Sequence, residues 1–489
     1  MRAFFNTVAL FLTVLILSYA VDVSAEVPAK SQTLDQDEIV NLVIERSFGI
    51  KQAEMGVAET KEGIPTAKSV FDTNLAMSGS YQYDNSKQTS SLFGDRTDTW
   101  LWNLSLSKEI PSGTRLGLSW ANTRSQTFNA AVGGVQIIPS QALYEPILGV
   151  SLAQPLMQNA FGMNDRLGVK QAKLAYEASD SDLRRKIDLQ VYQALRNYWS
   201  LVFVRKHIVA QKKAVRFARD FLSTTREERR LGTAEETDLL AARANLLNRE
   251  DELMNLQEME RTTLESLRRD LEYDPDVFVQ VTRKDPPFEN PGMADDERIN
   301  AAFERRGDYQ ALRKNLNRLN VRLKVAKNVR WPKLDLVSSL ELNDIDPSYS
   351  RAVSDMDSPN VRVGLNFSIP LENRAARADT RRTTAEKAGA LYALKDLENK
   401  ILNEISRLVA EVGSRQRIVV TSRKVLELQV AKVREEMKNY HMGRSSSYVM
   451  VQYQNDAVSA ERHLIESWLD YQNSVLGLWL ADGSIVAGK

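Results

Sequence analysis

The residues on which most enzymes and metal sites rely are scarce in this sequence. Cysteine is absent, and histidine occurs only at His207, His441 and His463. Disulfide frameworks, thiolate ligands and nearly all histidine-built metal sites are therefore excluded. A hydrolytic or redox centre has few residues left to use, so we expect no enzyme, no cofactor and no catalytic or metal-ligating residues.

The charge balance bears on possible partners. Lys plus Arg (65) nearly cancels Asp plus Glu (64), which leaves a formal charge of +1 over 489 residues. Such a chain has no general electrostatic field with which to gather nucleic acid. We therefore expect no nucleic-acid partner.

Polar residues with an informative spacing lie around two glycines. Leu231-Gly232-Thr233 and Met442-Gly443-Arg444 each interrupt a very long helical pattern. Glycine permits a positive φ and a tight reversal of the chain, so each glycine predicts a helical hairpin turn. The charged run Arg226-Glu-Glu-Arg-Arg230 before the first turn is typical of a solvated helix end.

The elements that position these turns are long helices. From about Asn164 to Arg230 there is no proline, and apolar residues recur at spacings of three and four. About 67 residues give a rod near 100 Å long. Three further segments follow the same pattern, at about Glu235–Leu271, Arg374–Tyr440 and Ser446–Leu480. Helices of this length must pack as coiled coils.

A shorter helix and a set of strands precede each long helical pair. The helices are expected at about Asp35–Lys68, with Thr33 and Gln36 at capping-box spacing, and at about Asp295–Asn328. Period-two alternation follows, from Leu75 to Tyr83 and in later segments through Ile369, and Pro111-Ser-Gly113 predicts a tight turn. One apolar and one polar face suit strands with lipid outside and water inside, or the sheet of a soluble protein.

Two copies of one unit make up the rest of the chain. Asp37-Glu-Ile-Val-Asn41 aligns with Asp296-Glu-Arg-Ile-Asn300, an offset of 259, whereas Pro155 aligns with Pro370, an offset of 215. We expect a first repeat at 26–292 and a second at 293–489, joined by a proline-bearing connection. The first repeat has 44 additional residues between these matches, which add a hairpin to the sheet or decorate its edges.

The N-terminus predicts export. Arg2 precedes an apolar stretch from Val8 to Leu17, and Val23-Ser24-Ala25 fits a signal peptidase site, so residues 1–25 form a signal peptide cleaved between Ala25 and Glu26. No later stretch is long and apolar enough to span a bilayer as a helix. If the mature protein enters a membrane, it must do so as a closed barrel.

In this order the elements resemble the TolC-like outer-membrane efflux proteins. The resemblance covers nearly all of the mature chain and includes the strand-to-helix exit Gln154-Pro155-Leu156 and the two glycine turns. It implies an α+β membrane protein in which three subunits close one transmembrane β-barrel and one long coiled-coil α-helical barrel. It further implies a location in the outer membrane, contact with its lipid, and a periplasmic adaptor and an inner-membrane pump as partners.

The resemblance also assigns roles at the turns. Leu231, Gly232, Thr233, Met442, Gly443 and Arg444 become tips that contact the adaptor. Asp238 and Tyr440 become a polar link of the periplasmic gate, with Arg444, Ser445, Val449 and Gln452 nearby. Ser445 stands where well-studied members have a basic residue, and Val449 and Gln452 stand where some have an acidic ring. An apolar or amide constriction is therefore expected in place of a cation-binding one.

The function expected from these patterns is export through an outer-membrane channel as part of a tripartite efflux system. A channel serving as the outlet of type I protein secretion has the same architecture. A periplasmic coiled-coil scaffold with a small soluble sheet is the alternative from another class.

Overall fold

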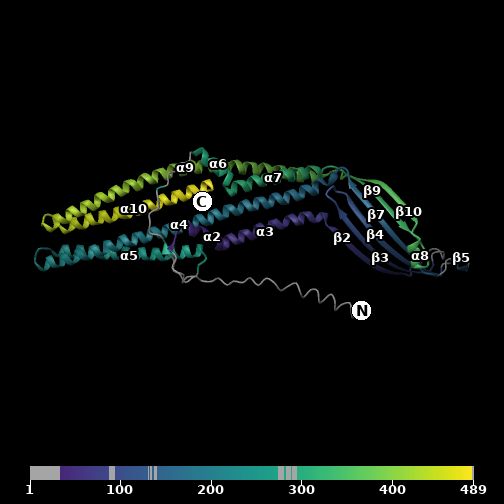
Figure 1. The fold of residues 1–489 in the computed structure, drawn as a ribbon, viewed down its shortest axis with the longest axis horizontal. Helices are drawn as coiled ribbons and strands as arrows, with labels where there is room; N and C mark the ends of the chain where they lie inside the picture. Colours follow the sequence, from purple (N-terminus) through teal and green to yellow (C-terminus); the bar gives the residue numbers. More distant parts are fainter. Residues whose placement is uncertain are drawn as a thin grey trace, which may run out of the picture.

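The computed structural model describes residues 33–87, 94–129, 131–132, 135–136, 140–273, 280–281, 288 and 295–486. Within these residues the chain is a long helical rod with a sheet at one end and two helical hairpin turns at the other (Figure 1). The predicted signal peptide, its cleavage site at Ala25–Glu26 and most of the proline-bearing connection lie outside the described residues.

The long helices confirm the sequence prediction closely. They are α4 (Met163–Arg230), α5 (Glu236–Asp270), α9 (Arg374–His441) and α10 (Ser447–Asp482). Helices α4 and α9 have 68 residues each, which is about 100 Å of helix. Helix α4 packs against α5, and α9 packs against α10, as two hairpins that lie side by side through contacts of α10 with α4. None of the described helices is both long and apolar enough to cross a bilayer.

The two shorter helices were predicted as continuous, and this was wrong. The first is divided into α2 (Gln36–Arg46) and α3 (Phe48–Lys68), and the second into α6 (Asp295–Arg305) and α7 (Gly307–Asn328). The separating residues Ser47 and Arg306 have ψ of 119° and 120°, which breaks the helical hydrogen-bond ladder. Both are buried, so each break places a polar residue inside the rod.

The start of the first helix also differs from the prediction. Asp35 is the N-cap residue and forms a capping box with Glu38, through bonds of 2.9 and 3.0 Å. Thr33, which was expected in that role, lies in β1 (Thr33–Leu34), which pairs in parallel with β8 (Gln280–Val281). An aspartate directly before the helix caps it better than a threonine two residues earlier, because the cap must contact the N2 or N3 amide.

The described strands form one main antiparallel sheet of six strands. In spatial order these are β10 (Ser358–Ser368), β9 (Lys333–Asn343), β7 (Leu143–Pro155), β4 (Arg115–Phe128), β3 (Arg96–Glu109) and β2 (Thr73–Asp84). The predicted turn at Pro111-Ser-Gly113 joins β3 to β4, with Gly113 at φ +74°. The short strands β5 (Ala131–Val132) and β6 (Val135–Gln136) pair separately, and α8 (Tyr349–Ser354) packs against β7.

The two faces of the main sheet differ in chemistry, and the ladder register keeps each face uniform across all six strands. One row on the apolar face consists of Leu75, Leu106, Leu118, Val150, Leu340 and Val361. The adjacent row on the opposite face consists of Ala76, Ser105, Ser119, Gly149, Glu341 and Asn360. The polar face is hollowed around Ser107, Ser151 and Arg362, which makes it the concave side. The apolar side chains are exposed in the single chain.

The largest hydrophobic core lies midway along the rod. It joins Ile39 of α2, Leu195 and Tyr198 of α4, Ile405 of α9 and Leu476 of α10, all at 0 % exposure. These residues bring four helices together here. The hairpin turns lie far from this core, at the opposite end of the long helices from the sheet (Figure 1).

Candidate gate at the helical tips

Both hairpin turns are built in the same way. Gly232 and Gly443 have φ of +81° and +69°, directly after α4 and α9 have ended. An added Cβ at either glycine would meet nothing within 4 Å, so the positive φ, and not crowding, requires glycine. The apolar side chains before them are largely exposed, Leu231 by 64% and Met442 by 56%. Each tip thus offers an apolar knob to solvent.

A hydrogen-bonded cluster just behind the turns joins the two hairpins. The hydroxyl of Tyr440 on α9 donates to Oε2 of Glu228 on α4 at 2.6 Å and lies 3.1 Å from Oγ of Ser447 on α10. The Tyr440 ring packs against Phe221 of α4, with 5.6 Å between the ring centroids. Burial and the bond to Glu228 raise the pKa of the Tyr440 phenol, so it remains a donor at neutral pH.

Asp238 takes a different contact from the one predicted. It is the third residue of α5, and its Oδ2 accepts from the backbone N–H of Glu235 at 3.1 Å, closing a capping box. The carboxylate bonded to Tyr440 is that of Glu228 instead. The prediction paired Tyr440 with Asp238, but the third position of α5 lets Asp238 satisfy a free amide of its own helix start instead.

The other predicted gate and tip residues differ in exposure and contacts. Ser445 donates to Glu436 of its own hairpin, and Arg444 and Thr233 are exposed. On α10, Val449 is half-buried and Gln452 is exposed. Within the described part of the chain, no group of three or more histidine, aspartate or glutamate residues could hold a metal ion. The side chain of His441 lies outside the described residues.

Sequence reasoning missed Glu228, although a signal was present. The charged run Arg226–Arg230 was interpreted as a solvated end, and four of its five residues are indeed exposed. Glu228 is the half-buried exception. It follows the buried Phe221 and Thr225 by seven and three residues, and this spacing places all three on one face of α4.

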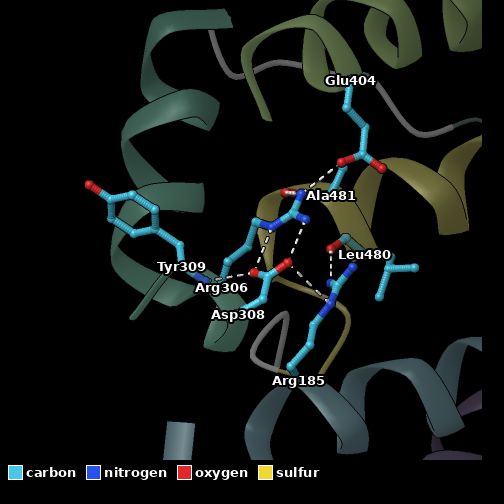
Figure 2. A network of polar contacts seen from close by, with 7 residues as sticks. All are labelled: Arg185, Arg306, Asp308, Tyr309, Glu404, Leu480 and Ala481. Carbon is cyan, nitrogen blue, oxygen red and sulfur yellow. Dashed lines mark hydrogen bonds and ion pairs between the residues drawn. The ribbon is translucent and has the colours of Figure 1, made fainter. Parts of the chain in front are cut away.

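The other end of the α9–α10 hairpin is held by a buried ion network at the α6–α7 break (Figure 2). The guanidinium of Arg306 donates to both carboxylate oxygens of Asp308, at 3.1 and 2.8 Å, and to Oε2 of Glu404 on α9 at 2.7 Å. It also donates to the carbonyl of Ala481 at 3.2 Å. The Arg306 side chain is only 5% exposed, so this is a desolvated, bidentate arrangement.

A second arginine completes the network. Arg185 of α4 donates to the carbonyl of Leu480 at 3.1 Å and lies 3.6 Å from Asp308. Leu480 and Ala481 are in the last turn of α10, where carbonyls have no partner within the helix. Two cations therefore neutralise the negative end of α10. Gly307 permits the start of α7 to approach α4 closely, since a Cβ there would lie 2.2 Å from the carbonyl oxygen of Ser181.

Comparisons with known proteins agree with this architecture at the level of the fold. The sequence matches no protein-family model. No curated protein matches it either.

Solved structures, in contrast, match over nearly the whole chain. The outer-membrane channel OprN superposes with a TM-score of 0.69 at 16% identity, over 93% of both chains. The CmeC outer membrane channel of Campylobacter jejuni has a TM-score of 0.65 at 14% identity, over 94% of this chain and 90% of its own. The outer membrane protein VceC of Vibrio cholerae has a TM-score of 0.68 at 11% identity, over 92% and 96%.

At identities this low, the similarity carries information about the fold alone. The superposition extends over more than nine-tenths of the chain, which includes its long paired helices and its antiparallel sheet. The chain therefore has the fold of the TolC-like outer-membrane efflux channels.

Proposed function

We propose that the chain is a subunit of a homotrimeric outer-membrane channel that exports substrates from the periplasm, or from an inner-membrane pump, to the exterior. The six-stranded sheet carries this proposal, because it combines an apolar convex face with two edge strands, β2 and β10, that end the ladder. In lipid, unpaired backbone groups at those edges would each cost several kcal/mol. Pairing β2 of one copy with β10 of the next removes both edges.

Threefold closure gives a plausible pore size on physical grounds. Three copies of six strands make an eighteen-stranded barrel, within the size range that leaves an aqueous channel. Cyclic symmetry places that channel on the axis. Its lumen would be lined by the polar, serine-rich face of each sheet.

The helices support the same assembly. On α5, Leu240, Leu247 and Met254 follow one another at intervals of seven residues and are each more than half exposed. A heptad stripe of this kind is the seam of a coiled coil. Because α5 and α9 are the outer members of the four-helix set, the next subunit can cover this stripe with α9, and the rods then form a closed tube.

Two repeats account for the organisation of each subunit, at 26–292 and 293–489. The helix breaks at Ser47 and Arg306 are separated by 259 residues, the offset of the aligned sequence segments. The 44 additional residues of the first repeat correspond to one more hairpin in the sheet, since this repeat supplies four strands and the second supplies two.

Passage is controlled at the helical tips. The bond from Tyr440 to Glu228 ties the two hairpins together, whereas the contact with Ser447 lies within the α9–α10 hairpin. We assign Asp238, Arg444, Ser445, Val449 and Gln452 to the same gate. Leu231, Gly232, Thr233, Met442, Gly443 and Arg444 present the contact surface for a periplasmic adaptor joined to the pump. Opening requires the cross-hairpin bonds to break.

Cysteine cross-linking tests the closed barrel directly, because the chain contains no cysteine of its own. Cysteines introduced in pairs, one on β2 and one on β10, should yield a covalent trimer on oxidation. A pair at Gly117 and Ser151, which face each other on β4 and β7, is the matched control and should cross-link only within the chain. A mature protein that stays soluble and monomeric, with no β2–β10 cross-links, would support the scaffold alternative.

A further inference from the structure

Two arginines lie on the apolar face of the sheet near the end farthest from the long helices. Arg124 is opposite Trp100 on one side and Tyr144 on the other, and Arg96 is opposite Phe128. The guanidinium of Arg96 is 4.0 Å from the Phe128 ring centroid, and that of Arg124 is 5.9 Å from the Tyr144 centroid. Stacking on aromatic rings keeps both cations at the surface of the sheet.

These arginines mark one edge of an apolar band whose width is close to that of a membrane. Lys108 marks the other edge on the same face of β3, eight residues from Trp100. That separation is about 26 Å of strand, or about 20 Å across a bilayer at the usual barrel tilt. The intervening positions on this face are Leu106, Leu104 and Trp102. Arg124 therefore lies at the level of lipid head groups, beside the aromatic residues typical of that level.

The two arginines differ in their ionic partners. Arg96 forms an ion pair with Asp98 at 3.1 Å. Arg124 donates to the neutral amide oxygen of Gln126 at 3.2 Å, and no carboxylate among the described residues lies within ion-pair distance of it. Among the described residues, Arg124 is thus a cation without a counter-ion at the edge of an apolar surface.

A second observation comes from Asn122, two residues before Arg124 on the same face of β4. Asn122 is only 5% exposed and lies between Trp102 and Pro146 in the ladder. Neither its amide oxygen nor its amide nitrogen has a hydrogen-bond partner in the described chain. Buried amides are normally satisfied, because a missing bond is costly. A ligand with an anionic group and a neighbouring hydrogen-bonding group would satisfy both residues.

We propose that Arg124 and Asn122 bind the phosphate-bearing head group of a lipid in the outer leaflet. Guanidinium groups suit phosphate because they donate two parallel hydrogen bonds to it. A hydroxyl or carbonyl of the same head group can bond the Asn122 amide once the neighbouring side chains turn aside to uncover it. The acyl chains then lie along Trp102 and Leu104. This site rests on the proposed function, since it requires the apolar face to contact lipid.

Native mass spectrometry of the detergent-solubilised protein tests the site with a defined probe. The probe is a bisphosphorylated acylated glucosamine disaccharide, compared with its dephosphorylated form and with inorganic phosphate. Wild type should bind the phosphorylated lipid at least tenfold more tightly than the dephosphorylated one. Arg124→Gln should abolish that preference, and Arg124→Lys should retain part of it. Arg362→Gln, which removes a cation from the polar face, should leave it within twofold.

Two outcomes would overturn the site. One is an unchanged preference in Arg124→Gln, and the other is complete displacement of the lipid by millimolar inorganic phosphate, which would indicate a free-anion site. Conductance in a phosphatidylcholine bilayer distinguishes a failure of the lipid site from a failure of the proposed channel function. Trimers that conduct but bind both lipids equally contradict the lipid site alone, whereas a wild-type protein that neither trimerises nor conducts contradicts the channel itself.

Discussion

The hairpin of α9 and α10 is held at its two ends by contacts of different strength. At the base, Arg306 is buried and bonds to two carboxylates and a carbonyl. At the tip, Tyr440 is half-buried and bonds to the Glu228 carboxylate and to neighbouring hydroxyl groups, beside exposed turns. Breaking a buried ion network costs several kcal/mol, whereas a single bond to a charged group contributes about 1.5–3 kcal/mol. The base is therefore held more strongly than the tip, which supports the proposal that the hairpin opens at its tip.

The largest effect is expected at the base. Arg306→Ala leaves Asp308 and Glu404 without their buried partner and the Ala481 carbonyl without a donor, so the free energy of unfolding should fall by about 3–5 kcal/mol. Thermal unfolding of the purified protein measures this. The control Arg407→Ala removes an arginine that is 65% exposed and pairs with Glu411. It should cost less than about 0.5 kcal/mol, and equal losses in the two variants would contradict the fixed base.

The base should also respond to pH through Asp188 of α4. Burial raises its pKa from 3.8 to about 6, against the opposing effect of Arg185, with Asp308 raising it and Arg306 lowering it. The folded state therefore binds more protons than the unfolded state between these values. The contribution of Asp188 to stability is most favourable below about pH 4 and declines as pH rises through about 6.

Asp188→Asn removes this dependence. At pH 7.5 the variant should be more stable than wild type by up to about 3 kcal/mol, the equivalent of the pKa shift, because no charge has to be buried. The advantage should disappear near pH 4. The measurement is the unfolding midpoint of both proteins from pH 4 to 8. If the difference between wild type and variant does not change with pH, Asp188 is not the residue that makes stability depend on pH.

Packing at the α6–α7 break gives a third comparison. In Gly307→Ala the new methyl group meets the backbone of α4, 2.2 Å from the Ser181 oxygen, so we expect a loss of about 1–3 kcal/mol. Gly389→Ala on α9 is the matched control, since a Cβ there meets nothing within 4 Å. It should stabilise the helix by about 0.5–1 kcal/mol. Thermal unfolding should therefore show a loss of stability in Gly307→Ala and a gain in Gly389→Ala. An unchanged stability in Gly307→Ala would show that the helices at the break can move apart, and would contradict the prediction.

The sequence predicted the regular parts of the molecule better than the polar contacts. The long helices and the strand alternation follow from periodicity, which the chain obeys over many turns. The break at Arg306 could not be read in this way, because it depends on charges contributed by Glu404 and on the last carbonyls of α10, all distant in sequence.

The same limit applies at the tip. Tyr440 was predicted to bond to Asp238 and bonds to Glu228 instead, and both are acidic residues within six positions of the turn at Gly232. Glu228 is favoured as the partner of Tyr440 only because it lies on the buried face of α4, together with Phe221 and Thr225. Local spacing determines which residues share a helix face, whereas the partner across two hairpins depends on how the hairpins pack.

The smallest effect on stability, and the most direct effect on the gate, is expected from Tyr440→Phe. The ring still packs on Phe221 and the cluster is only half-buried, so the free energy of unfolding should fall by about 1.5 kcal/mol, the lower end of the range for a hydrogen bond to a charged group. The cross-hairpin bond is lost, and single-channel conductance or open time in a planar bilayer should rise. Asp238→Ala should also raise conductance if Asp238 belongs to the gate, whereas a residue that only caps α5 would leave it unchanged. If Asp238→Ala opens the channel and Tyr440→Phe does not, the link through Glu228 is not the one that closes the tip.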